Sequence, residues 1–424
     1  MDPKFFSSQI QSLSSFDKIK SEYLLGLDIG TEAVKAIIFQ KPVFKKEEKA
    51  KLIIWGKYQE YFDKSNVFNS GGFEERGIKV AISESIKGVH QNFIQNLGRK
   101  INIHTNNLPV LVSLPPNILK EKIISQSLER ENPEAVISKK EESDIYKIIF
   151  KNTQDEIAKN FSQEFGILTE DIQFISLRIL EIKFDGYKIS KLEGFKGKRL
   201  DFRVLTTFSL KGYLKNIEKI LKDLKLNILE FLYKSQNLPR LFFDEESEAI
   251  FLDVGGEISQ VFLIKKGKIE LVFEFNSGGL DFTERLSKIL GLNLEDSRNL
   301  KHNYSNLLLS EEVRKKVREI LSEERQSWFE NLKKASRSVL LGQRILLPSN
   351  IFIFGGGSLL PEIQEALEEG NWEDLPFFSR PKTKLLYPKD LKIIEDKTKG
   401  LISPQDINLI LGLTPFNKDS LVSV

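Results

Sequence analysis

The sequence predicts an α/β protein built from two similar halves with a cleft between them. Residues 23–39 read as an apolar strand, a glycine-containing turn and a second β-rich run, and residues 51–62 add a third strand. Residues 248–275 repeat this order as strand, Asp-x-Gly turn, strand, basic turn and strand. Each half therefore opens with the same β-hairpin, and such an internal repeat is typical of a duplicated fold.

The rest of the first half alternates between helices and strands. Apolar residues at helical spacing predict a helix over 77–98, and an apolar run ended by two prolines predicts a buried strand over 108–116. Residues 117–203 change character, because a helix over 141–161 is followed by a group of strands. Such segregation is typical of a small α+β insert. A charged helix over 211–226 then restores the earlier rhythm.

The second half continues with a strongly helical stretch over 311–345 and a strand, triple-glycine turn and helix over 350–370. These patterns give the expected domain limits. They are an N-terminal tail or amphipathic helix (1–22), the first half (23–105), the insert (106–203), the completion of the first half (204–247), the second half (248–416) and a short tail (417–424).

The first 22 residues carry an amphipathic pattern. Drawn as a helix, they place serines mostly opposite one broad apolar face, formed by Phe5, Phe6, Ile10, Leu13, Phe16 and Ile19. The pattern is compatible with a disordered tail, or with a helix that contacts a membrane surface or a partner. The C-terminal residues 417–424 have neither the length nor the aromatic–basic pattern of a membrane helix.

Composition excludes several classes of function. The 424 residues include no cysteine and three scattered histidines, which excludes disulfides, thiolate zinc sites, cysteine nucleophiles and a histidine-based metal site. The 63 basic and 60 acidic residues give a net charge of +3 without a basic block, so the charge pattern gives no indication of nucleic-acid binding. No apolar run approaches the roughly 18 residues that span a bilayer, and the N-terminus lacks signal-peptide features, so we expect a cytoplasmic protein.

Three glycine turns follow apolar strands, at residues 27–31, 252–257 and 354–358. A single such turn usually reflects a backbone that needs positive φ. Three together indicate a phosphate site, because glycines let backbone N–H groups approach phosphate oxygens without a Cβ in the way. Two hairpin turns that face each other can then clamp a polyphosphate.

Polar residues suited to such a ligand lie beside these turns. Asp28 and Asp253 can hold Mg²⁺ through its water shell, since Mg²⁺ prefers a few carboxylates and keeps several waters. Thr31 supplies a hydroxyl group and Lys35 a cation. The third turn, Gly355 to Ser358, opens a helix whose N-terminus can hold the α-phosphate and the adenine–ribose end.

The order and spacing of these motifs resemble a known superfamily. Asp28-Ile-Gly-Thr with Lys35, then LDVGG, then FGGGSLLPEI resemble the phosphate-1, phosphate-2 and adenosine motifs of actin, sugar kinases and heat-shock chaperone ATPases, over residues 23–370. The resemblance implies an actin-like (ribonuclease H-like) duplicated fold with a central cleft for ATP and Mg²⁺ and a small inserted α+β subdomain. The residues it implies as nucleotide ligands are Gly30, Thr31, Lys35, Gly255, Gly256, Lys301, Gly355, Gly356, Gly357 and Ser358.

Within this superfamily, the intervening segments resemble the bacterial cell-division protein FtsA. Residues 183–208 are similar to a strand ending in Asp-Gly, a Gly-x-x-Gly turn and a strand entering the core, and residues 276–304 resemble the FtsA helical region. The resemblance implies an ATP-binding scaffold that self-associates as a dimer or polymer, links a ring of the tubulin homologue FtsZ to the inner face of the cell membrane, and recruits other division proteins.

Several residues depart from the FtsA pattern. Glu257 follows the second glycine turn, and its negative charge opposes ATP unless it points away. Ser297-Arg298 replaces an Ala-Glu pair whose glutamate usually contacts ribose. Gln236 lies 17 residues before Asp253, where actin-like ATPases place the glutamine that orients the hydrolytic water, although it also fits a surface glutamine. We therefore expect at most a slow ATPase, with Asp28, Asp253 and Gln236 as its catalytic candidates.

Two alternatives share the fold. One is a protein that resembles PilM of type IV pilus assembly and binds the cytoplasmic peptide of a membrane partner; SLPP at 113–116 and the degenerate second turn favour it. The other is a sugar or metabolite kinase, which needs a catalytic aspartate in a substrate cleft, and the segments outside the nucleotide motifs do not supply one.

Overall fold

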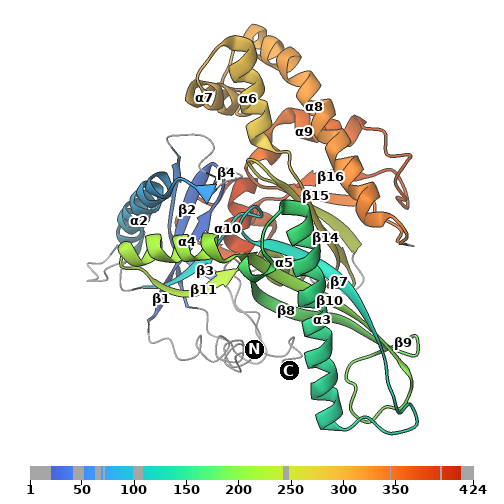
Figure 1. Cartoon of the computed structure of the whole chain (residues 1–424). Helices are drawn as coiled ribbons and strands as arrows, with labels where there is room; N and C mark the ends of the chain where they lie inside the picture. Colours follow the sequence, from blue (N-terminus) through green and yellow to red (C-terminus); the bar gives the residue numbers. More distant parts are fainter. Residues whose placement is uncertain are drawn as a thin grey trace. The chain divides into compact units, whose positions relative to one another are not determined.

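The structure is a computed structural model (Figure 1). It describes residues 21–41, 52–62, 68–69, 72–98, 108–241, 248–343, 345–391 and 394–411. These residues divide into two compact units, of which the smaller is Ile118–Ile217 and the larger comprises the described residues of Ile19–Asn117 and Glu218–Pro415. Residues 1–20 of the predicted N-terminal helix and the whole predicted tail 417–424 lie outside the described residues.

The first sheet of the larger unit has the strand order β11-β6-β1-β2-β3-β17. Its strands are β1 (Tyr23–Ile29), β2 (Ala33–Gln40), β3 (Leu52–Tyr61), β6 (Pro109–Ser113), β11 (Asn227–Leu232) and β17 (Ile394–Asp396). β1, β2 and β3 are antiparallel, whereas β6 and β11 continue the sheet parallel to β1. All seven residues of β1 are buried, as expected for a strand covered on both faces.

The second sheet repeats this arrangement with the order β14-β13-β12-β15-β16. Its strands are β12 (Glu248–Val254), β13 (Ser259–Lys265), β14 (Lys268–Phe275), β15 (Asn350–Phe354) and β16 (Lys382–Leu385). Again three antiparallel strands in hairpin succession are continued by two parallel strands. The shared order and the shared strand directions are those of the duplicated α/β fold that the sequence predicts.

In the described part of the chain, eight α-helices belong wholly or in part to the larger unit. They are α2 (Glu75–Leu97), α4 (Lys211–Asp223, which begins in the smaller unit), α5 (Lys234–Leu241), α6 (Gly279–Leu290), α7 (Leu294–Ser305), α8 (Glu311–Leu340), α9 (Pro361–Glu369) and α10 (Ile407–Leu411). α2 packs on β3 and β2, and α8 packs on β14 and α9. Trp328 of α8 is fully buried in the second core, where its Nε1 donates a hydrogen bond to Ser259 Oγ at 3.2 Å.

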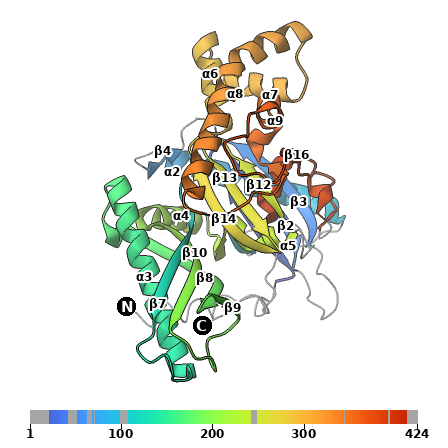
Figure 2. The same cartoon turned by 90° about the vertical axis from the view of Figure 1, so that its right-hand side faces the viewer.

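The smaller unit is an α+β structure with an antiparallel sheet of order β7-β10-β8-β9. Its elements are β7 (Lys120–Glu129), α3 (Lys139–Phe165), β8 (Ile172–Phe184), β9 (Tyr187–Ile189) and β10 (Arg199–Leu210). Figures 1 and 2 show α3 alongside this sheet, and Ile149 of α3 and Phe202 of β10 are buried in their shared core. The unit shares residues 118–203 with the insert expected over 106–203; the domain limits expected from the sequence stay a prediction.

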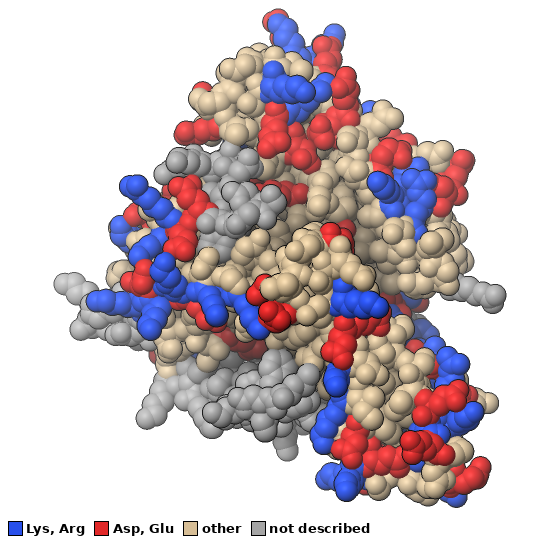
Figure 3. Space-filling view, in the orientation of Figure 1, with Lys and Arg blue, Asp and Glu red and all other residues tan. Residues whose placement is uncertain are grey.

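The surface charge of the described residues is mixed. Figure 3 shows acidic and basic side chains interspersed over one face, in line with the nearly balanced totals of 63 and 60. Among the described residues, no helix has the length and apolar character needed to cross a membrane.

Candidate functional site

A cleft in the larger unit collects the glycine turns that the sequence singles out. It encloses about 790 Å³ of space, counting the part open to solvent. Residues from both sheets, from α5 and from the segment around α10 line it. The predicted site residues among its lining are Asp28, Gly30, Thr31, Lys35, Asp253, Gly255, Gly256, Lys301 and Gly356.

The first hairpin turn presents a carboxylate paired with an ammonium group. Asp28 at the end of β1 lies opposite Lys35 of β2 in the strand register, and both are more than nine-tenths buried. Lys35 Nζ lies 3.6 Å from Asp28 Oδ2 and donates a hydrogen bond to the carbonyl oxygen of Gln405 at 2.8 Å. The turn between them closes with a hydrogen bond from Gly30 N to Ala33 O.

The second hairpin turn presents a more tightly held carboxylate. Asp253 at the end of β12 is 2% exposed. Lys234 Nζ of α5 makes a salt bridge with its Oδ2, and Asn408 Nδ2 of α10 donates a hydrogen bond to its Oδ1 at 2.9 Å. Both carboxylate oxygens of Asp253 therefore have a donor from the chain itself.

The two hairpin turns meet in the cleft. The backbone N–H of Glu257 donates a hydrogen bond to Thr31 Oγ1 at 3.3 Å. A Cβ at Gly256 would lie 2.5 Å from the same Thr31 Oγ1, so this approach requires glycine. The carbonyl oxygens of Gly255 and Gly256 accept hydrogen bonds from the first two residues of α6. These contacts fix the spacing between the two turns.

Glu257 lies beside this junction and is half-buried. Its Oε2 accepts a hydrogen bond from Asn117 Nδ2 at 3.2 Å, whereas its buried Oε1 has no hydrogen-bond partner among the described residues. Burial, and secondarily the charge of Glu32, raise the pKa of Glu257 to about 7. The expected repulsion of phosphate by this side chain therefore depends on pH near neutrality.

The third turn follows β15, and one of its residues, Gly356, lines the cleft. A Cβ added to Gly356 would meet nothing within 4 Å. Gly355 has φ of +91° and backs onto Asp253, whose Oδ1 would lie 2.2 Å from a Cβ. Ser358 is fully buried and its Oγ donates a hydrogen bond to the carbonyl oxygen of Gly355 at 2.7 Å. Gly355, Gly357 and Ser358 thus shape the turn from behind the cleft surface.

Helix α7 brings Lys301 into the lining of the cleft, and Arg298 lies about one turn before it in the same helix. Lys301 Nζ donates a hydrogen bond to Gly279 O at 2.7 Å and lies 3.7 Å from Glu32 Oε1. Burial lowers the pKa of Lys301. Arg298, which stands where the FtsA pattern has a ribose-binding glutamate, donates through Nη1 to the carbonyl oxygen of Phe62 at 2.8 Å. Arg298 therefore joins the two halves of the larger unit.

Several further residues of the cleft have no motif that marks them in the sequence, and four of them can carry charge or hold Asp253. They are Glu32, Lys234, His302 and Asn408. Burial lowers the pKa of His302 to about 4, so its imidazole is neutral at pH 7. Lys234 lies two residues before the predicted Gln236, which belongs to α5 but whose side chain lies outside the described part of the structure.

The arrangement fits a polyphosphate better than it fits a metal. Gly30, Gly255 and Gly356 expose backbone to the cleft, and Lys35 and Lys234 offer ammonium groups to phosphate oxygens. Mg²⁺ at Asp28 and Asp253 stays a prediction, and the residues as placed fit it poorly, because each carboxylate already has a lysine partner. Within the described ranges, no cluster of three or more His, Cys, Asp or Glu side chains is placed to hold a metal ion.

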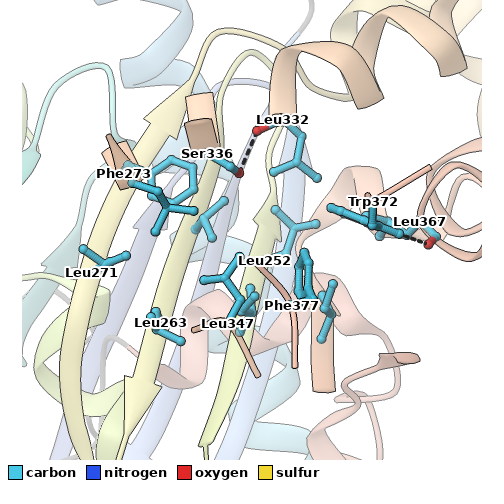
Figure 4. Close-up of a pocket in the computed structure, with 14 residues that line it drawn as sticks. Leu252, Leu263, Leu271, Phe273, Leu332, Ser336, Leu347, Leu367, Trp372 and Phe377 are labelled. Atoms are coloured by element: carbon cyan, nitrogen blue, oxygen red, sulfur yellow. Dashed lines mark hydrogen bonds between the residues drawn. The ribbon is translucent and has the colours of Figure 1, made fainter. Parts of the chain in front are cut away.

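A second cavity lies in the core of the second half (Figure 4). It measures about 460 Å³ in the same terms, and its lining is apolar apart from Ser336. The Ser336 hydroxyl donates a hydrogen bond to Leu332 O, and Trp372 Nε1 donates one to Leu367 O, as Figure 4 shows. With no charged group in its lining, this cavity offers nothing to a nucleotide.

Comparison with known proteins supports the fold. No protein-family model and no curated protein matches the chain. A solved chain of the PilM-PilN type IV pilus biogenesis complex is similar at 14% sequence identity with a TM-score of 0.63, over 93% of this chain and 98% of that chain. The ethanolamine utilization protein EutJ from Carboxydothermus hydrogenoformans is 13% identical over 98% and 99% of the two chains, with a TM-score of 0.45. Together with the repeated strand order, the first likeness shows that this chain has the predicted actin-like, duplicated α/β fold.

Proposed function

We propose that this chain is an actin-like assembly protein that binds a nucleotide in the cleft and holds a segment of a membrane-associated partner. The observation that carries the proposal is the end-to-end similarity to a chain of the PilM-PilN type IV pilus biogenesis complex, over 93% and 98% of the two chains. In that reading the partner segment is the cytoplasmic peptide of a PilN-like membrane protein.

The cleft supports nucleotide binding by the chain's own residues. Lys35 of β2 and Lys234 of α5 line the cleft beside the two hairpin turns, and the glycines of those turns add no side chain there. Lys301 and the neutral His302 lie in the lining from α7, in the region where the motif pattern places adenosine. These groups position and neutralise phosphates, which is sufficient for binding.

Fast hydrolysis has little support from the same residues. Asp253 is engaged through both oxygens, and Asp28 is paired with Lys35, so neither carboxylate is placed to act as a base toward water. We therefore propose slow or absent turnover, with the bound nucleotide acting on conformation or assembly.

A division scaffold of the FtsA type is the second candidate, carried by the sequence pattern of residues 183–208. In the structure β8 ends at Phe184, the turn at Asp185 and Gly186 has positive φ, and β10 begins at Arg199. On this alternative the partners are an FtsZ-like tubulin homologue, further copies of the chain and other division proteins, at the inner face of the membrane.

Two binding measurements test these proposals. The first is titration of the purified chain with a labelled cytoplasmic peptide of a PilN-like protein and, in parallel, with the C-terminal peptide of an FtsZ-like protein. Saturable binding of the first peptide supports pilus assembly, and binding of the second alone replaces it with the division function.

The second measurement is titration with a fluorescent ATP analogue. Gly356→Val adds a side chain to open space in the cleft without a backbone clash, so it should weaken binding at least about tenfold. Gly212→Val, on the exposed face of α4, is the matched control and should leave the affinity unchanged. If Gly356→Val and wild type bind the analogue with equal affinity, the proposal that the nucleotide binds in this cleft is refuted.

A further inference from the structure

Lys234 occupies an unusual position for a lysine. Its side chain is 9% exposed, and its Nζ makes a salt bridge with Asp253 Oδ2, whose own side chain is 3% exposed. The second oxygen of Asp253 accepts the hydrogen bond from Asn408. A buried ammonium group is costly unless it is paired and hydrogen-bonded, so this contact is a built feature of the cleft.

The other hairpin has a similar pair. Lys35 lies 3.6 Å from Asp28 Oδ2. The two aspartates carry two negative charges, and the two lysines carry two positive charges. The lysines together thus supply the charge of one divalent cation. A metal ion placed between Asp28 and Asp253 would meet the ammonium groups of both lysines and would be repelled by them.

We propose that Lys234 is a built-in cation at the Asp253 side of the cleft, so that this chain binds its nucleotide without a divalent metal. The inference rests on the proposed nucleotide binding and adds the residue that replaces the metal's charge. An ammonium group has three N–H donors, of which the salt bridge with Asp253 uses one. Because Lys234 lines the cleft, its remaining donors can reach a phosphate oxygen.

The competing explanation is that Lys234 only stabilises the fold by neutralising Asp253. The two explanations differ in their dependence on metal. If Lys234 is purely structural, nucleotide binding should require Mg²⁺. If Lys234 is a built-in cation, the wild type should bind nucleotide without Mg²⁺, and removal of Lys234 should make binding depend on Mg²⁺.

The test is titration of the full chain with a fluorescent ATP analogue in Mg²⁺ and, separately, in EDTA. Wild-type affinity should change by less than about threefold between the two buffers. Lys234→Met should lose at least about tenfold in EDTA and recover part of this in Mg²⁺, because Asp253 is then released for the metal. Lys234→Arg keeps the charge and should remain independent of metal. Lys219→Met is the control, since Lys219 pairs with Glu75 on the surface.

Each outcome decides one question. Wild-type affinity that falls more than about threefold in EDTA overturns the built-in cation and leaves the proposed function intact. If the wild type binds no nucleotide in either buffer, nucleotide binding itself is refuted.

Thermal unfolding is a second test of the role of Lys234. Mg²⁺ should raise the Tm of Lys234→Met and not that of wild type, and equal shifts in the two proteins overturn the inference. Should Lys234→Met not fold, Lys234→Met/Asp253→Asn removes the unpaired charge and should bind weakly in both buffers.

Discussion

Replacing Glu257 by glutamine tests the electrostatics of the cleft directly. The glutamine keeps the shape of the side chain, and its carbonyl oxygen can still accept the hydrogen bond from Asn117. In the folded chain the pKa of Glu257 is raised from 4.5 to about 7. Because the folded state binds this proton more tightly than the unfolded state, the group favours folding below pH 4.5 and that advantage is lost as the pH rises through 7. The variant should therefore be more stable than wild type at alkaline pH.

The size of the effect follows from the pKa difference. A raise from 4.5 to about 7 corresponds to about 3.4 kcal/mol at full ionisation. Since Glu257 is only half-buried, solvent screening reduces this to about 1.5–2 kcal/mol. At pH 5, half a unit above the unfolded pKa, only part of this penalty has developed, so variant and wild type should differ by less than about 1 kcal/mol.

The assay is urea unfolding of wild type and Glu257→Gln at pH 5 and pH 8. Comparing the two proteins at each pH cancels other titrating groups, such as Glu230, whose pKa burial also raises to about 7. A difference that does not change between pH 5 and pH 8, or a variant that is less stable at pH 8, would refute the electrostatic reasoning. The same variant should bind the ATP analogue more tightly at pH 8, because it removes a negative charge beside the junction of the two hairpin turns.

Three further substitutions test the packing around the site and in the smaller unit. Gly355→Ala should lower the free energy of unfolding in urea by about 2 kcal/mol or more, because φ is +91° and the new Cβ would press on Asp253. The control Gly212→Ala in α4 should leave the free energy of unfolding unchanged or raise it by up to about 1 kcal/mol. Equal effects of the two substitutions would contradict backbone strain at Gly355. Trp328→Ala should cost about 3–5 kcal/mol, measured in the same way, and a loss below about 1 kcal/mol would mean that the second core is not closed around it. Phe202→Ala should speed amide hydrogen exchange in the unit Ile118–Ile217 while nucleotide affinity stays unchanged; a change in affinity would link that unit to the cleft.

Local patterns in the sequence were sufficient for the architecture. An apolar strand, a glycine turn and a second strand occupy fewer than about 20 neighbouring residues, and side-chain periodicity within such a stretch reflects its burial. The hairpins of β1 and β2 and of β12 and β13 were therefore predictable, as was the position of Asp28 and Asp253 where β1 and β12 run into their turns. The repetition of that pattern then predicted the duplicated fold, which the repeated strand order confirms.

Specific function was less accessible to the same patterns. The motifs indicate an actin-like nucleotide cleft, but assembly partners are chosen by surfaces whose residues are scattered along the chain. The structural similarity to a chain of the PilM-PilN complex turns the proposal toward pilus assembly, whereas the sequence resemblance favours FtsA. The partner therefore stays a proposal for the peptide titrations to decide.

The partners of the site residues were decided by tertiary structure alone. The lysine that neutralises Asp253 lies 19 residues before it, and Asn408, which holds its other oxygen, lies 155 residues after it. The half-buried Glu257 accepts at Oε2 a hydrogen bond from Asn117, which is 140 residues away in the sequence. Charge and pKa depend on what surrounds a side chain within a few ångströms, and in this fold those neighbours come from distant segments. The sequence by itself thus determined where the phosphate turns lie, and the packing of the two halves determined which charges face them.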